Sequence, residues 1–397
     1  MKRHSHAVEP ATRPQRQLLH ISYAVGGFLL TAATASVFLI STVARRVVTP
    51  ARKRAKETDV LALNPESGTI TLGRNPDTAL PGRYGLWFAA DDRYLKLGPI
   101  LSSDASTVTR SLLNPASELG GLPRKGAATF SGWYFAHPDE LGLPWQDTLV
   151  ETPVGPAPAW LFPAAEATNR WVIAVHGRGT TKSECLRAVP VLHEAGCTVL
   201  LTSYRNDGEA PRSGDGLYGL GDTEWEDVDA AIAFAIDSGA TSVVLMGWSM
   251  GGAISLQTSL RANRSDVITG LILESPVVDW GSVLAYQADA GRIPVFVRRA
   301  AIAAISNRWG RSLTGLETGV DFPALDMVRR SGELDKPMLV LHSDDDGFVP
   351  ADGSRALSEL RQDLVTFVPF STARHTKLWN FNEDRWNQAI RDWLATH

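Results

Sequence analysis

A serine lies between two glycines in the stretch Gly247-Trp248-Ser249-Met250-Gly251, after an apolar run and before a helix-forming one. This spacing is typical of a tight strand-to-helix turn that exposes the serine hydroxyl at the end of the strand. The residues two before and two after the serine approach each other in such a turn, so Gly247 and Gly251 leave space that a Cβ would fill. We predict that Ser249 is a nucleophile; the alternative is a glycine-rich turn with a passive serine.

A serine hydroxyl needs a base to become a nucleophile, and the base needs an acid to orient it. When the three groups follow successive strands of a parallel sheet, the acid comes before the base along the chain. Asp346 follows an apolar run at 338–341, and His375 follows another at 365–368. The sequence therefore predicts a triad of Ser249, Asp346 and His375.

Other residues compete for the acid and base roles. Asp344 and Asp345 stand in the same turn as Asp346, and this run of three carboxylates could also form a solvated turn or a weak cation site. Glu274 and Asp279 follow an earlier strand and are further alternatives for the acid. The remaining histidines precede the sheet, lie within it or on a helix, or end the chain: His4, His6, His20, His137, His176, His193, His342 and His397.

An apolar run at 171–175 leads into His176-Gly177-Arg178-Gly179. A glycine-containing turn at this place brings backbone N–H groups next to the nucleophile, where they can bind the negative oxygen of a tetrahedral intermediate. By position we assign these donors to the N–H groups of Arg178 and Met250. The alternative is a tight strand-to-helix turn that only needs glycine for its shape.

Apolar runs alternate with helical stretches through the C-terminal two thirds of the chain, after a hairpin expected at 148–151 and 159–162. Such alternation predicts an α/β fold with a mostly parallel central sheet covered by helices on both faces. The expected strands are 171–175, 198–202, 242–246, 271–273, 338–341 and 365–368. The expected helices are 182–195, 224–238, 252–262, 353–361 and 383–396.

The pattern divides the chain into successive segments. We expect an N-terminal tail at 1–20, a transmembrane helix at 21–44, a basic linker at 45–66, a β-rich segment at 67–144 and a catalytic domain at 145–397. Short strands at 69–72, 84–88 and 94–97 support the β-rich segment, which carries no catalytic pattern. A lid would lie at about 280–330, where the apolar stretch Ile293–Trp309 fits either a core helix or a lid over an acyl pocket.

The stretch Ile21–Ala44 carries no charged residue. As a helix it would be about 36 Å long, enough for a hydrocarbon core of roughly 30 Å. A cleaved secretory signal is the alternative, but its apolar region is normally shorter, about 7–15 residues. We therefore expect an uncleaved, single-pass membrane anchor.

The charges on either side of this stretch predict its orientation. Four basic residues precede it, whereas six follow it: Arg45, Arg46, Arg52, Lys53, Arg54 and Lys56. Because the more basic flank tends to stay in the cytoplasm, we expect the catalytic domain on the cytoplasmic side of the cell membrane.

The composition narrows the function classes. The 397 residues are 44% hydrophobic, which supplies a full core and excludes a disordered chain. A formal net charge of −4 argues against nucleic acid as a partner. The two cysteines, Cys185 and Cys197, exclude a disulfide scaffold and a four-cysteine zinc site, and we expect two buried thiols rather than one bridge. Nothing in the sequence calls for a metal or another cofactor.

Taken together, Gly247–Gly252, His176–Gly179, Asp346–Pro350 and His375 resemble the α/β-hydrolase superfamily over roughly residues 145–397. The stretches Ser203–Gly208 and His375–Asn380 are similar to bacterial, mainly actinobacterial, membrane-anchored serine hydrolases of the esterase and acylaminoacyl-peptidase-like branch. The resemblance implies a Ser-His-Asp triad at Ser249, His375 and Asp346, oxyanion donors at Arg178 and Met250, and no metal. Ser343 departs from the family pattern, which often has glycine there, and the resemblance does not explain the β-rich segment.

These observations favour a membrane-anchored serine hydrolase that cleaves a small acyl ester or thioester through an acyl-enzyme. A serine peptidase acting on short peptides would use the same residues. A catalytically silent membrane scaffold that keeps the fold is the alternative from another class. The fold alone does not decide the substrate.

Overall fold

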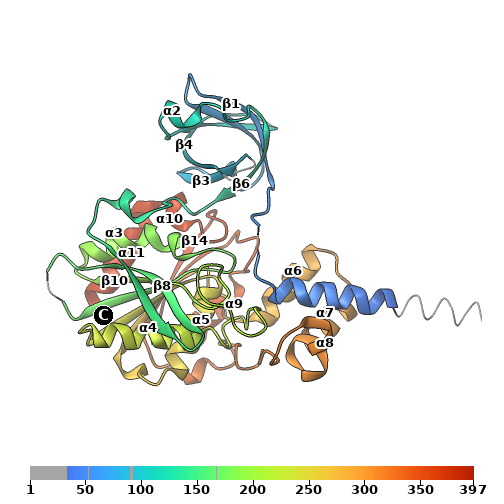
Figure 1. Cartoon of the computed structure of the whole chain (residues 1–397), viewed down its shortest axis with the longest axis vertical. Helices are drawn as coiled ribbons and strands as arrows, with labels where there is room; N and C mark the ends of the chain where they lie inside the picture. Colours follow the sequence, from blue (N-terminus) through green and yellow to red (C-terminus); the bar gives the residue numbers. More distant parts are fainter. Residues whose placement is uncertain (1–33, 52, 90–92, 167) are drawn as a thin grey trace, which may run out of the picture.

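The computed structural model describes residues 34–51, 53–89, 93–166 and 168–397. It contains a helix, a small β-barrel and a larger α/β domain in chain order, with the barrel at one end of the α/β domain (Figure 1). We call these parts the N-terminal helix (described over residues 34–48), the barrel (residues 58–131) and the sheet domain (residues 146–397).

The sheet domain is built on eight strands in the order β14-β13-β12-β11-β9-β10-β8-β7. All neighbouring pairs from β9 to β14 are parallel, and only β7 and β8 run antiparallel to their neighbours, so the predicted mostly parallel sheet is confirmed. The strands are β7 Gln146–Thr152, β8 Gly155–Phe162, β9 Arg170–Val175, β10 Thr198–Thr202, β11 Ser242–Trp248, β12 Ile268–Glu274, β13 Met338–Ser343 and β14 Val365–Phe370.

Helices cover both faces of this sheet. The helices on its faces are α3 Val189–Glu194, α4 Trp225–Asp237, α5 Met250–Arg261, α9 Asp352–Leu360, α10 Leu378–Phe381 and α11 Glu383–Thr396. Helices α6 Trp280–Ala290, α7 Val295–Ser306 and α8 Arg311–Thr314 lie to one side of the sheet (Figure 1). Alternate residues of one strand belong to opposite cores: Ile173 and Val175 pack with α4, α5 and α9, whereas Val172 and Ala174 pack with α3 and α11. Burial on both sides explains why these strands are continuously apolar in the sequence.

The extent predicted for one helix is wrong. Residues 182–195 do not form a single helix, because Lys182–Ala188 is a 3-10 helix and α3 begins only at Val189. Pro190 lies at the start of α3, where its missing N–H is tolerated; inside a longer helix the proline ring would clash with the preceding turn.

The barrel closes in the order β1-β2-β5-β4-β3-β6, and every neighbouring pair is antiparallel. Its strands are β1 Thr58–Asn64, β2 Thr69–Gly73, β3 Tyr84–Phe88, β4 Arg93–Ser103, β5 Thr107–Leu112 and β6 Gly126–Ser131, with the short helix α2 at Ala116–Leu119. The segment expected to be linker up to residue 66 therefore contains β1. Val60 and Leu63 of β1 are buried in the barrel, but the preceding basic residues hide this pattern in the sequence.

The N-terminal helix lies beside α7 and α8, as Figure 1 shows in blue and orange. It extends beyond the expected end at Ala44 to Val48, and both residues are fully buried in the core of the sheet domain. Ser41 Oγ and Arg45 Nε donate to the carbonyl of Leu313, at 2.8 Å and 2.7 Å. Residues 21–33 of the expected anchor lie outside the described residues, and within the described part no helix is both long enough and apolar enough to cross a bilayer.

The segment expected as a lid is helical, comprising α6, α7 and α8. Helix α7 buries Val297, Ala301 and Ile305 against the sheet domain while it exposes Val295 and Phe296. The stretch is therefore partly core, and its action as a lid stays a prediction. Cys185 and Cys197 are both buried and unbridged.

Candidate active site

The turn between β11 and α5 carries Ser249 in a left-handed backbone conformation, with φ 52° and ψ −115°. Non-glycine residues seldom adopt such angles, and they persist where the surroundings hold them. Here the Ser249 N–H donates to the carbonyl of Glu274 at 3.0 Å, and the Ser249 carbonyl accepts from Val277 at 3.1 Å. The turn is thus hydrogen-bonded to the end of the neighbouring strand β12, and the hydroxyl stands at the N-terminus of α5.

The glycines of this turn are required by close backbone contacts. A Cβ on Gly247 would lie 2.4 Å from the carbonyl oxygen of Gly251, and a Cβ on Gly251 would lie 2.1 Å from that of Val175. No real Cβ contact is this short, and backbone atoms cannot move aside as a flexible side chain can. The structure therefore confirms the prediction that Gly247 and Gly251 leave space that a Cβ would fill.

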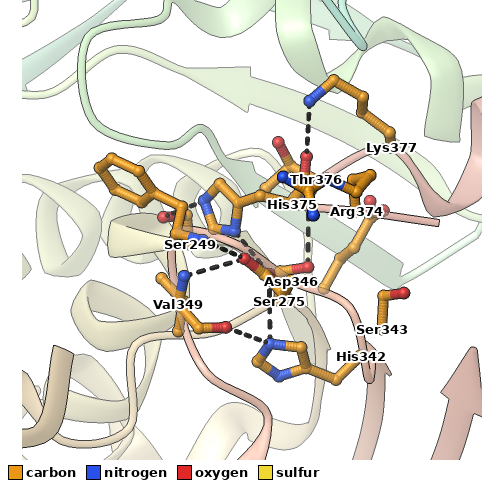
Figure 2. Close-up of polar contacts among 12 residues, drawn as sticks. Ser249, Ser275, His342, Ser343, Asp346, Val349, Arg374, His375, Thr376 and Lys377 are labelled. Carbon is orange, nitrogen blue, oxygen red and sulfur yellow. Dashed lines mark hydrogen bonds and ion pairs between the residues drawn. The ribbon is translucent and has the colours of Figure 1, made fainter. Parts of the chain in front are cut away.

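Three polar side chains from three segments meet at this turn (Figure 2). His375 Nε2 lies 3.0 Å from Ser249 Oγ, and His375 Nδ1 lies 2.7 Å from Asp346 Oδ2. Asp346 follows β13, and His375 follows β14, so parallel neighbouring strands deliver both to the same edge of the sheet. The arrangement can pass a proton from the serine hydroxyl to an imidazole that a carboxylate orients.

The carboxylate of Asp346 is buried and fully engaged. Its Oδ1 accepts from the N–H groups of Phe348 and Val349, both at 2.8 Å. Burial by itself would raise the pKa of Asp346, but the adjacent His375 and His342 outweigh this effect and hold the pKa well below its usual range. Asp346 is therefore ionised at neutral pH, as an acid that stabilises an imidazolium must be.

The competing carboxylates have other partners. Asp344 pairs with Arg355 on the surface, and Asp345 Oδ1 accepts from the Arg374 N–H at 2.9 Å. Glu274 is buried and accepts from the indole N–H groups of Trp248 and Trp386, at 2.8 Å and 2.9 Å. Asp279 accepts from two backbone N–H groups at the start of α6. None of the four touches His375 in the described structure, which leaves Asp346 as its acidic partner.

The turn after β9 lies against the serine turn. Gly177 is close enough that a Cβ on it would lie 3.5 Å from the Ser249 Cβ. Its own N–H is occupied, because it donates to Glu184 Oε2 at 2.9 Å. By contrast, the N–H groups of Arg178 and Met250 donate to no acceptor among the described residues. These two groups can therefore serve as oxyanion donors, and that assignment stays a prediction.

The Arg178 side chain has a different function from its backbone N–H. Its guanidinium donates to the carbonyls of Arg46 and Thr49, at 2.8 Å and 3.0 Å, and burial lowers its pKa. The end of the N-terminal helix is therefore attached to the candidate oxyanion turn.

The alpha/beta hydrolase family matches residues 172–395 of this chain. The protein belongs to the alpha/beta hydrolase family. Residues 59–130, which cover most of the barrel, match a second family described as a domain of unknown function (DUF8805). No curated protein sequence matches the chain.

Three solved structures are similar to part of this chain. An esterase from Pyrococcus furiosus is 15% identical, with a TM-score of 0.51 over 66% of this chain and 94% of its own. An esterase from a Rhodococcus species is 18% identical, with a TM-score of 0.44 over 63% of this chain and 98% of its own. A monoacylglycerol lipase from Paleococcus ferrophilus is 21% identical, with a TM-score of 0.42 over 61% of this chain and 99% of its own. At 15% identity, the likeness to the Pyrococcus furiosus esterase shows the fold alone.

Two further histidines of this hydrolase are buried with structural partners. His342 lies between Ser354 Oγ at 2.8 Å and the Val349 carbonyl at 3.0 Å, and its Nε2 is 3.3 Å from Asp346 Oδ2. His176 contacts Asp207 at 3.1 Å. His342 was expected to be structural and His176 was expected in the candidate oxyanion turn; the proximity of His342 to Asp346 was not visible from the sequence.

Side chains outside the predicted triad shape the loop around His375. Ser343 accepts from the Ala373 N–H and donates to Asp345, and Ser275 accepts from the Thr376 N–H. Ser343 departs from the family pattern, which was a usable signal, and the structure gives it this hydrogen-bonding role. Ser275 and Glu184 had no signal, because short polar residues in loops are common. Among the described residues no cluster of three or more His, Cys, Asp or Glu could hold a metal ion.

Proposed function

We propose that this protein is a serine hydrolase that cleaves a carboxylic ester or thioester, with Ser249 as nucleophile, His375 as base and Asp346 as acid. The observation that carries the proposal is the continuous contact from Ser249 Oγ to His375 at 3.0 Å and from His375 to Asp346 at 2.7 Å. The N–H groups of Arg178 and Met250, which donate to no acceptor among the residues that the structure describes, support it. A catalytically silent scaffold would have no need of this geometry.

The geometry implies a two-step reaction. Ser249 Oγ forms a bond to the substrate carbonyl carbon while its proton moves to His375 Nε2, and the oxyanion accepts from the N–H groups of Arg178 and Met250. The carbon–oxygen or carbon–sulfur bond to the leaving group then breaks, and His375 returns the proton to that group. Water attacks the acyl-enzyme with His375 again as base, which releases the acid and restores Ser249.

Replacement of the nucleophile tests this proposal. Ser249→Ala should lower kcat for short p-nitrophenyl esters on the order of 10⁶-fold, because no other group can form the acyl-enzyme. It should also abolish labelling by a fluorophosphonate probe without changing Tm. Ser358→Ala is a matched control, since this hydroxyl on α9 donates to the carbonyl of Arg355 within the same helix. Full activity in Ser249→Ala would contradict the assignment.

Comparing aminoacyl amides with acyl esters separates the esterase from a peptidase. The triad serves both reactions, so the distinction lies in the leaving group that the site accepts. We expect kcat/KM for esters to exceed that for matched amides. A preference for short peptide substrates would replace the esterase assignment by the peptidase one while leaving the triad intact.

We also propose that the stretch Ile21–Ala44 anchors the hydrolase in the cell membrane, as in the membrane-anchored bacterial branch that the sequence resembles. Its lack of charge supports this, and so do Val37, Phe38 and Leu39, which the N-terminal helix exposes. The full chain should remain in the membrane pellet after carbonate extraction, whereas Leu29→Arg combined with Leu30→Arg should release it. Release of the unmodified chain would contradict anchoring.

The proposed orientation places the sheet domain in the cytoplasm, on the argument of six basic residues against four. Protease added to intact cells should then leave the domain uncut, and cut it only after the membrane is opened. Digestion of the domain in intact cells would show that it lies outside the cytoplasm and would contradict the proposed orientation.

A further inference from the structure

The loop that carries His375 is bent on both sides of the imidazole. Arg374 and Thr376 have positive φ values, 60° and 48°, which non-glycine residues seldom adopt. Such a backbone keeps its shape only where its surroundings hold it. Because a proposed base must stay within hydrogen-bond distance of Ser249 and Asp346, whatever holds this loop bears directly on catalysis.

The sheet domain holds the inner side of the loop through its own side chains. The Ala373 N–H donates to Ser343 Oγ at 2.8 Å, and the Thr376 N–H donates to Ser275 Oγ at 3.2 Å. Asp345 accepts from the Arg374 N–H at its carboxylate and from the Arg374 guanidinium at its carbonyl, both at 2.9 Å.

A residue of the barrel reaches the outer side of the same loop. Asp77 Oδ1 lies 3.3 Å from Lys377 Nζ and 3.6 Å from Arg374 Nε. This oxygen is buried and accepts no hydrogen bond within the described residues, so the two cations are its partners. The carboxylate therefore balances two positive charges that flank His375 in the sequence and would otherwise repel each other.

The barrel in turn fixes Asp77. The connection between β2 and β3 contains it, and the fully buried Arg110 of β5 donates to three carbonyls of that connection, those of Thr78, Leu80 and Gly82. The Asn75 side chain accepts from the N–H of Asp77 at 2.9 Å. Since a buried guanidinium with several carbonyl acceptors leaves the connection little freedom, the position of Asp77 is set from within the barrel core.

We propose that Asp77 is a positioning residue for His375, so that the barrel acts as an intramolecular clamp on the catalytic loop of the hydrolase. Asp77 touches neither substrate nor reacting atoms; it acts through Arg374 and Lys377. The inference rests on the proposed function, in which His375 is the base. It assigns a role to a domain that carries no catalytic pattern of its own.

The test removes the charge and keeps the size of the side chain. Asp77→Asn should lower kcat for short p-nitrophenyl esters roughly tenfold with little change in KM, because small displacements of a catalytic group reduce the rate strongly. Labelling of Ser249 by a fluorophosphonate should slow by a similar factor. Asp77→Glu keeps the charge and should retain most of the activity.

Glu383→Gln is the matched control. It breaks the ion pair between Arg83 of the barrel and Glu383 of α11, which joins the same two domains away from His375. It should leave kcat unchanged. Loss of kcat in this variant to the same extent as in Asp77→Asn would show that any loosening of the interface suffices, and unchanged kcat in Asp77→Asn would overturn the clamp.

Hydrogen exchange supplies a readout that does not depend on turnover. A peptide spanning residues 371–377 should exchange faster in Asp77→Asn than in the unmodified chain or in Glu383→Gln. If Ser249→Ala kept ester hydrolysis while this exchange changed as expected, the proposed function would fail and the clamp on the loop would stand. Unchanged exchange in an active enzyme would instead reject the clamp alone.

Discussion

The turn at Ser249 and the loop at His375 hold their side chains by opposite means. Both contain non-glycine residues with positive φ, 52° at Ser249 and 60° and 48° at Arg374 and Thr376. The serine turn is held largely by backbone contacts: the Ser249 N–H and carbonyl bond to the end of β12 and the residues after it, and Gly251 packs closely against the Val175 carbonyl. Two side chains add to this support, because the Trp248 indole donates to Glu274 and Ser255 Oγ donates to the Gly251 carbonyl.

The His375 loop is fixed by side chains that come from distant segments. Ser275, Ser343 and Asp345 accept its N–H groups, and Asp77 of the barrel meets its two cations. The sequence separation between Asp77 and Lys377 is most of the chain. The serine turn therefore requires that Gly247 and Gly251 have no Cβ, whereas the His375 loop requires charged and hydroxyl side chains. Adding a methyl group should damage the first, and removing a charge should damage the second.

The largest expected effect on the histidine side comes from Asp346→Asn. An amide can donate to His375 Nδ1 and so favour the tautomer that cannot accept the serine proton, for which we expect a loss of about 10⁴-fold in kcat. Steady-state hydrolysis of short p-nitrophenyl esters measures it. Asp344→Asn is the control, because Asp344 contacts Arg355 rather than His375, and its kcat should stay unchanged. Equal activity of the two variants would remove Asp346 from the mechanism.

The same variant carries a pH signature. The pKa of Asp346 is lowered in the folded protein, so the carboxylate contributes stability above the usual carboxyl pKa of about 4 and loses it as the pH falls. The difference in unfolding free energy between the unmodified chain and Asp346→Asn should therefore be largest near neutral pH and shrink below about pH 4. Denaturant unfolding at several pH values measures this, and a difference that grows on acidification would contradict the sign.

The contrast also explains what the sequence could predict. The serine turn is formed by consecutive residues. The five residues 247–251, with their two glycines, were therefore enough to predict a turn between a strand and a helix. The buried strands were equally visible, because burial on two faces makes them continuously apolar; 198–202 coincides with β10 and 383–396 with α11. The helix expected at 182–195 failed because Pro190 divides it.

Contacts between distant segments could not be predicted in the same way. The type and order of Asp346 and His375 indicated that they should approach Ser249, and the structure places them within hydrogen-bond distance, while their roles stay predictions. Neither Asp77 nor Ser275 belongs to a sequence motif. Each contacts the His375 loop only because folding brings two distant segments together. The barrel strands also gave weak signals: all but β4 have five to seven residues, and β1 follows a basic stretch that is typical of a linker.

Gly251→Ala tests the serine side of the contrast, with a smaller expected loss than Asp346→Asn. The new Cβ would lie 2.1 Å from the Val175 carbonyl oxygen and 2.5 Å from that of His176, so the turn must shift relative to β9. That shift separates Ser249 from the proposed oxyanion donor at Arg178, and a misplacement near 1 Å can cost about 10²-fold in kcat. Tm should fall as well, because both neighbours are backbone atoms in the core.

Gly332→Ala is the matched control for this substitution, since a Cβ at Gly332 would meet no atom within 4 Å. It should leave both kcat and Tm unchanged. If Gly251→Ala behaved like Gly332→Ala, the turn would tolerate added atoms, and the support of Ser249 could not rest on close backbone contact. If instead Gly251→Ala lost activity while hydrogen exchange at residues 371–377 stayed unchanged, the two halves of the site would be shown to be held independently.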